Sequence, residues 1–200
     1  MEAGENLKDE VKKIFDPYAQ RIYDPIMEGF NDYLNNDSKN GHIHSKTVKS
    51  NLIASYVIDR LRKVVAENPN MRWSERKRMI SIIIGDKIRC RFKKLDKNLK
   101  TSNVVTGQVK AFRNHELPYD KKQVVCVDIG WKLNDFYTEL LEIYLVCPKD
   151  EKKVSWRIPF SDLTVNKGQI RIFEEKQEET FIIAKIKESA KRRTDAETGS

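Results

Sequence analysis

Between Lys87 and Lys93 the chain alternates basic and apolar side chains, one residue at a time. Successive side chains of an extended strand point to opposite faces, so this pattern is typical of a β-strand. Neighbouring basic residues on one face then lie about 6.6 Å apart. We expect these basic residues to face solvent: Lys87, Arg89, Arg91 and Lys93. We expect the alternate residues to be buried: Ile88, Cys90 and Phe92.

The apolar pattern before this strand predicts helices. Apolar residues recur at helical spacing over residues 7–33, and two Asp-Pro steps, Asp16-Pro17 and Asp24-Pro25, interrupt them. Proline disfavours a helix interior, so we expect short helices in series or one kinked helix. A polar loop then leads to a second helix, from about Lys46 to Glu67.

The rest of the chain predicts strands and one further helix. Residues 79–85 and 87–95 have the pattern of a β-hairpin with a two-residue turn at Gly85-Asp86. Thr101 or Ser102 is placed to cap a helix that runs to about His115. Further strands are expected at 123–131, 139–148, 153–160 and 169–175; residues 139–148 are equally compatible with a helix on propensity.

These elements predict an α+β fold in which N-terminal helices precede an antiparallel β-sheet with one inserted helix. We expect a helical region at residues 1–70, a sheet domain at 71–178 and a charged tail at 179–200. The apolar stripe of the N-terminal helices also suits a homo-oligomer, in which case the protein would be a structural or oligomerising scaffold.

Positive charge is concentrated in one quarter of the chain. The 200 residues carry a net charge of +8, and residues 51–100 alone hold 14 basic and five acidic residues. Spaced cations suit a polyanion, and Trp73 among them adds a stacking surface; a solvated strand face that discourages edge pairing is the alternative. The candidate residues for binding nucleic acid or an acidic protein are Lys87, Arg89, Arg91, Lys93, Lys94, Lys97, Lys100, Arg72, Arg76 and Arg78.

No catalytic signature is present, since the chain lacks a Gly-rich phosphate loop, a nucleophile elbow and an HExxH helix. A metal-dependent nuclease is the enzymatic alternative, and it requires Asp128, Glu139 and Glu142 to converge with a lysine beside the basic strand. His42 and His44 have the spacing of a zinc-binding pair, but no cysteine cluster completes a site. We therefore expect no metal and no cofactor.

The three cysteines, Cys90, Cys126 and Cys147, fall inside expected strands and form no CxxC pair. An odd number of such cysteines is typical of a reduced protein, so we expect buried free thiols and a cytoplasmic location. No apolar stretch approaches the roughly 20 residues of a membrane helix, so we expect no membrane partner.

Four segments in order, IRCRFKKLDKNLKTSNVVTGQVKAFRNHELP, VDIGWKLND, IYLVCPK and VSWRIPF, resemble a group of little-characterised bacterial and prophage proteins. The resemblance covers about residues 50–160. Members of that group are encoded beside a helix-turn-helix protein that carries a zinc-metallopeptidase domain. The resemblance carries over no catalytic residue. The matching positions are Arg91, Phe92, Lys93, Lys94, Leu95, Ser102 and Asn103.

Such gene pairs resemble toxin–antitoxin or phage-immunity modules, with the metallopeptidase protein as the antitoxin partner. We therefore expect a module component that binds nucleic acid or an acidic protein through its basic strand. The metal-dependent nuclease and the scaffold protein stay open as alternatives.

Overall fold

The N-terminal part of the chain forms helices in series, as its apolar stripe predicts. The computed structural model describes residues 2–101, 106–118, 124–150 and 153–163. In it α1 (Glu2–Phe15) is followed by the 3-10 turn η1 (Asp16–Tyr18) and by α2 (Ala19–Asn36). Pro17 is the second residue of this turn, whereas Pro25 lies inside α2. Only the first Asp-Pro step therefore ends a helix.

The 3-10 turn η2 (Ser38–Asn40) leads to α3 (Lys46–Ala66), which packs against α2 to form a helical hairpin. Ser45 caps α3, because its side chain accepts a hydrogen bond from the backbone N–H of Val48. The two helices approach closely at Gly29, where an added Cβ would lie 2.6 Å from the Cα of Val57.

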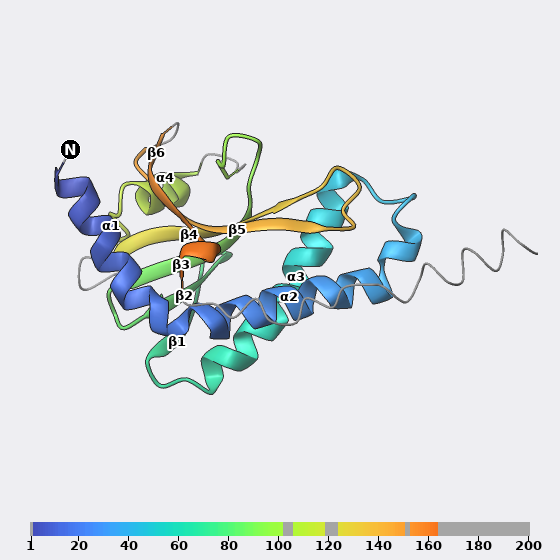
Figure 1. The fold of residues 1–200 in the computed structure, drawn as a ribbon, viewed down its shortest axis with the longest axis horizontal. Helices are drawn as coiled ribbons and strands as arrows, with labels where there is room; N and C mark the ends of the chain where they lie inside the picture. Colours follow the sequence, from blue (N-terminus) through green and yellow to red (C-terminus); the bar gives the residue numbers. More distant parts are fainter. Residues whose placement is uncertain (1, 102–105, 119–123, 151–152, 164–200) are drawn as a thin grey trace, which may run out of the picture. The chain divides into compact units, whose positions relative to one another are not determined.

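Among the described residues, six strands form one sheet in the order β1-β2-β3-β4-β5-β6 (Figure 1). All neighbouring strands are antiparallel except β3 and β4, which are parallel. The predicted α+β fold, with N-terminal helices, a mostly antiparallel sheet and one inserted helix, is confirmed; the β3–β4 pair alone departs from the expected antiparallel order of the described strands. The strands are β1 (Met71–Arg76), β2 (Met79–Ile84), β3 (Ile88–Lys94), β4 (Val125–Leu133), β5 (Leu140–Pro148) and β6 (Val154–Pro159).

The parallel pair follows from the helix inserted between its strands, α4 (Gly107–Arg113). Parallel neighbours need a crossover of a dozen or more residues, which this connection supplies. The cap of α4 differs from the prediction: Thr106 accepts a hydrogen bond from the backbone N–H of Val109. Thr101 instead forms an isolated β-bridge, and Ser102 lies outside the described residues.

Two further local predictions are confirmed in position. The turn between β2 and β3 lies at Gly85-Asp86, with positive φ angles of 57° and 54°, but it also includes Lys87, which was expected in the strand. The backbone N–H of Lys87 donates to the carbonyl of Ile84 at 3.1 Å and closes this turn. Residues 139–148, compatible with either structure on propensity, form a strand.

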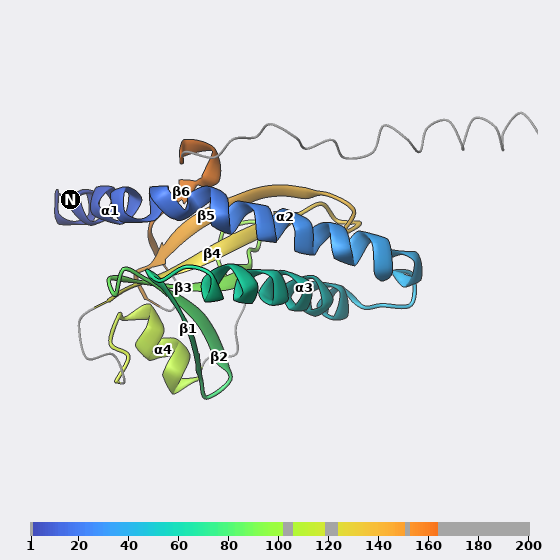
Figure 2. The ribbon, with the colours of Figure 1, turned by 90° about the horizontal axis from the view of Figure 1, so that it is seen from below.

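Helices cover both faces of the sheet (Figure 2). One face shares the main core with α1, α2 and α3, which contribute Phe15, Phe30 and Val57 to it. The other face carries α4, whose Phe112 joins a smaller cluster with Cys126. The apolar stripe of the N-terminal helices, which suits a homo-oligomer interface, is therefore buried in the chain's own core.

Strand β3 has the predicted alternation but not the predicted exposure. Ile88 and Cys90 are buried, as expected. Arg89 and Arg91 were expected in solvent, yet each is only 2% exposed. The prediction failed because it assumed that this face of the strand stays open, whereas Phe112 of α4 covers Arg91, and Arg89 is hydrogen-bonded to Ser74 and Ser81.

The cysteines occupy core positions, as predicted, and all three are free. Burial raises the pKa of the Cys90 thiol and raises that of Cys147 to about 12. Within the part of the chain that the structure describes, no helix has the length and apolarity to cross a membrane. The strand expected at 169–175 and the tail at 179–200 lie outside the described residues.

Gly29→Ala tests the close approach of α2 to α3. The added Cβ would lie 2.6–2.9 Å from backbone atoms of Tyr56 and Val57, so the helices must separate. We expect a loss of about 1–3 kcal/mol of unfolding free energy, despite the better helix propensity of alanine. Urea denaturation measures this. Gly107→Ala is the matched control, since no atom lies within 4 Å of its added Cβ. Equal stability of Gly29→Ala and wild type would contradict the packing described.

Candidate anion-binding cleft

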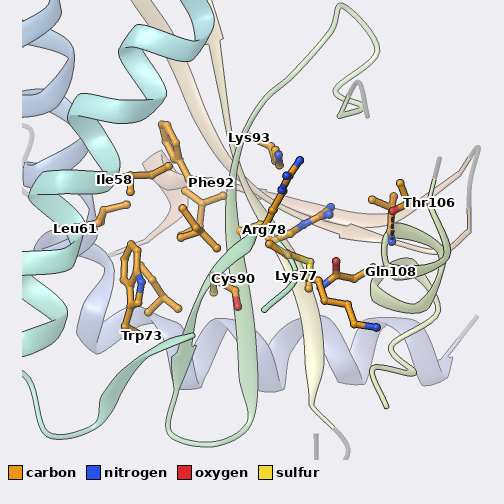
Figure 3. A pocket seen from close by; sticks show the side chains of 17 residues that line it. Ile58, Leu61, Trp73, Lys77, Arg78, Cys90, Phe92, Lys93, Thr106 and Gln108 are labelled. Carbon is orange, nitrogen blue, oxygen red and sulfur yellow. Dashed lines mark hydrogen bonds between the residues drawn. The ribbon is translucent and has the colours of Figure 1, made fainter. Parts of the chain in front are cut away.

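A cleft opens where β2 and β3 stop pairing with each other. The two strands pair only between Ile82–Ile84 and Ile88–Cys90. Beyond these residues Met79–Ser81 stays paired with β1, and Arg91–Lys94 stays paired with β4. The space between the diverging strands is a cleft of about 240 Å³, which residues of α3 and α4 also line (Figure 3).

The cleft has an apolar side and a cationic side. Figure 3 shows Ile58, Leu61 and Trp73 on one side and the charged ends of Arg78 and Lys93 on the other. The indole Nε1 of Trp73 is buried and has no hydrogen-bond acceptor among the described residues. Because an unpaired buried donor is unfavourable, this N–H is available to an acceptor on a ligand. A fitting ligand has both a flat apolar part and an anionic part.

Lys93 is the cation that distinguishes this cleft from an ordinary basic surface. Its side chain is half-buried, and it forms no hydrogen bond or ion pair with any described residue. Burial lowers the pKa of Lys93, and repulsion from Arg91 lowers it further, against the attraction of Asp128. A half-buried ammonium without an acidic partner is unfavourable in the free protein, and a bound anion would relieve it.

Two exposed cations, Lys77 and Arg78, form the two-residue turn between β1 and β2 and also line the cleft. Their φ angles are 47° and 65°, in the left-handed region. Hairpin turns of this kind prefer Asn-Gly, because most side chains disfavour that region. The side-chain amide of Gln108 donates to the carbonyl of Arg76 at 2.7 Å and so ties α4 to this turn.

A buried ion pair lies beside the cleft. Arg91 Nε donates to Asp128 Oδ1 at 2.8 Å, and Arg91 Nη2 donates to Oδ2 at 3.1 Å. The ring of Phe112 on α4 covers the guanidinium, with 3.6 Å between its centroid and Cζ. Because Asp128 neutralises Arg91, the charge of Arg91 does not serve a ligand as the charge of Lys93 does.

The structure brings together only part of the predicted set. Arg78 and Lys93 line the cleft, and Lys94 follows at the end of β3. Arg89 is buried and donates to serine hydroxyls of β1 and β2. The exposed members that do not line the cleft are Lys87, Lys97, Lys100, Arg76 and Arg72, the last paired with Asp86 at 3.0 Å.

Lys77 belongs to the basic stretch at residues 72–78 that the sequence presents beside Trp73, but the hairpin turn that it forms with Arg78 was missed. The sequence did contain a signal for this turn, because Lys77-Arg78 lies between two segments that each contain apolar residues and are long enough to form a strand. Gln108 was also missed, since its role depends on where α4 lies.

The carboxylates expected in a metal-dependent nuclease do not converge. Asp128 is held by Arg91, Glu142 forms an ion pair with Lys132 at 3.7 Å, and Glu139 is exposed. Across the described ranges, no three His, Cys, Asp or Glu side chains, the histidine pair at 42 and 44 included, are grouped to hold a metal ion.

Comparison with known proteins identifies no relative. No protein-family model, curated protein or solved structure matches the chain.

Removing one partner of the Arg91–Asp128 pair should destabilise the protein far more than removing both. Arg91→Met leaves a buried carboxylate and Asp128→Leu leaves a buried guanidinium, so we expect each to lose about 3–5 kcal/mol. The double variant removes both charges and should recover most of this loss. Urea denaturation of the three variants checks the cycle. A double variant no more stable than the worse single variant would show that the pair is not the source of the loss.

Lys77→Asn/Arg78→Gly should stabilise the protein, because it places the favoured residues at two left-handed positions. We expect a gain of about 1 kcal/mol, or roughly 2–4 °C in Tm, measured by calorimetry. Lys87→Gln removes a cation elsewhere without relieving φ and should leave Tm unchanged. An equal gain in this control would mean that charge repulsion, and not backbone strain, is being relieved.

Proposed function

We propose that this protein binds nucleic acid through the cleft between β2 and β3. The observation that supports this most is Lys93, a half-buried cation without an acidic partner among the described residues, which lies with Arg78 on the cationic side of the cleft, across from Trp73. A phosphate would supply the missing anion, and a base would supply the flat apolar part that Trp73 and Phe92 can contact.

A nucleic acid suits both sides of the cleft better than an acidic protein does. An aspartate or glutamate side chain would meet the cations but would leave the aromatic side and the Trp73 N–H without a partner. The separation of Asp128 from Glu139 and Glu142 further favours binding over metal-dependent cleavage.

We place this binding in a toxin–antitoxin or phage-immunity module, on the strength of the sequence resemblance over about residues 50–160. In that setting the helix-turn-helix/metallopeptidase protein is the partner that would control the binding. The cleft supports a binding role in such a module and requires no metal or cofactor for it.

Fluorescence anisotropy with labelled single-stranded DNA, single-stranded RNA and duplex DNA tests the proposal at ~50 mM salt and above. With contacts from Lys77, Arg78 and Lys93, we expect a log–log salt slope of about −2 on single strands, at about −0.7 per phosphate. Lys93→Gln should make the log–log salt slope shallower by about 0.7. It should also weaken affinity several-fold, by a similar factor for oligonucleotides of different sequence.

Lys87→Gln is the matched control, because Lys87 is exposed at the opposite end of the β2–β3 hairpin and does not line the cleft. It should leave affinity and slope unchanged. If both variants weaken binding equally, the cations act as a diffuse surface and the cleft is not the site. If the wild type binds none of the three nucleic acids at ~50 mM salt, the proposal is wrong; binding of an acidic peptide instead would assign the cleft to a protein partner.

A further inference from the structure

We infer that the groove between the N-terminal half of α3 and the end of β3 is a second phosphate subsite. The ligand would then be a single strand of several nucleotides that passes from the cleft into this groove. This inference rests on the proposed function and specifies the form of nucleic acid that the site accepts. We call this space the α3–β3 groove; its residues include Lys46, Ser50, Lys94, Asp96, Trp131 and Tyr137.

The α3–β3 groove is continuous with the cleft. It has a volume of about 480 Å³ and shares three residues with the cleft, namely Ile58, Phe92 and Lys93. Lys93 and Lys94 are consecutive on β3, so their side chains leave opposite faces of the strand. Lys93 lines both spaces beside the gap between β2 and β3, whereas Lys94 lines only the groove. The passage between the two spaces therefore runs along Ile58, Phe92 and Lys93.

The α3–β3 groove is predominantly cationic. Lys46, the first residue of α3, is exposed there, and the positive end of the helix dipole adds to its charge. Of the described residues that line it, only Asp96 carries a carboxylate, and its Oδ1 already accepts hydrogen bonds from the backbone N–H groups of Asn98 and Lys100. An anion is therefore attracted along the length of the groove.

Tyr137 lines the α3–β3 groove and is hydrogen-bonded to both elements that form it. Its φ angle is 63°, an unfavourable value for an aromatic residue, and its hydroxyl contacts the amine of Lys94 and the hydroxyl of Ser50. Burial alone would raise the pKa of Tyr137, but the hydrogen bonds from Lys94 and Ser50 lower it. The amine of Lys49 lies 5.7 Å from the ring centroid. Lysines therefore surround this phenol on more than one side.

Trp131 lines the groove and carries a buried indole donor. The residue is 1% exposed, and its buried Nε1 has no hydrogen-bond partner in the described structure. Its ring stacks on Phe92, with centroids 5.6 Å apart and planes at 15°. Trp73 provides the same combination in the cleft, so each space pairs an unpartnered indole N–H with nearby cations.

A single strand fits these two spaces and a duplex does not. Lys93 is half-buried and the indole N–H groups are buried, so a ligand must insert into the protein to reach them. A duplex presents its phosphates on a convex surface and keeps its bases paired. An unpaired strand can bend into a groove and stack its bases on aromatic side chains.

Isothermal titration calorimetry with thymidine 5′-monophosphate, with oligothymidylates of two, four and eight nucleotides and with a 12-base-pair duplex tests this inference. We expect affinity to rise at least tenfold from one to four nucleotides and then to level off, with the duplex binding at least tenfold more weakly than the tetranucleotide. Lys46→Gln should weaken the tetranucleotide at least threefold and leave the mononucleotide unchanged. Lys93→Gln should weaken both, and Lys39→Gln, an exposed control on η2, should weaken neither.

The outcomes separate this inference from the proposed function. If mononucleotide and tetranucleotide bind equally, or if Lys46→Gln has no effect on the tetranucleotide, the second subsite is refuted while cleft binding stands. If the duplex binds as tightly as the tetranucleotide, the preference for a single strand is refuted. If none of these ligands binds, the proposed function fails and the inference fails with it.

Discussion

The ion pair between Arg91 and Asp128 ties β3 to β4 at the one parallel contact in the sheet. Both side chains are almost fully buried, so each charge would be strongly unfavourable without the other. A slip of β3 by one residue would turn Arg91 to the opposite face of the sheet and leave Asp128 unpaired. The pair therefore specifies the register of β3, and that register sets where Lys93 and Lys94 emerge beside α3.

Several locally unfavourable features gather around the cleft and the α3–β3 groove. They are the unpartnered ammonium of Lys93, the left-handed φ angles of Lys77, Arg78 and Tyr137, and the unpartnered indole donors of Trp73 and Trp131. Comparable features also lie elsewhere, in the buried indole of Trp156 and in the left-handed φ angles of Asp86, Leu99 and His115. The cleft and the α3–β3 groove differ in that lysines line the same spaces as the tryptophans, so a bound anion would relieve the unpartnered ammonium there.

Local pattern predicted most of the elements. Period-two alternation identified β3, the Gly85-Asp86 turn and the strands 123–131, 139–148 and 153–160, and helical periodicity identified α3 to within one residue at its end. The parallel pairing of β3 and β4 was missed, although a long connection containing a helix is typical of a crossover. Of the candidate site, Arg78 and Lys93 were predicted, whereas Lys46 and Tyr137 were not, because their relation to β3 depends on packing across the sheet.

By itself the sequence determined which residues of β3 share a face, because the backbone geometry of a strand leaves no other arrangement. It also determined that positive charge is concentrated in the second quarter of the chain. Only the tertiary structure decided which of those cations meet solvent. A strand pattern separates two faces but does not say what covers each of them, and here α4 covers the basic face while Asp128, far along the chain, neutralises Arg91. The predicted cations that line the cleft are therefore Arg78 and Lys93, beside the gap between β2 and β3. This gap exists because the end of β2 stays paired with β1 and the end of β3 stays paired with β4.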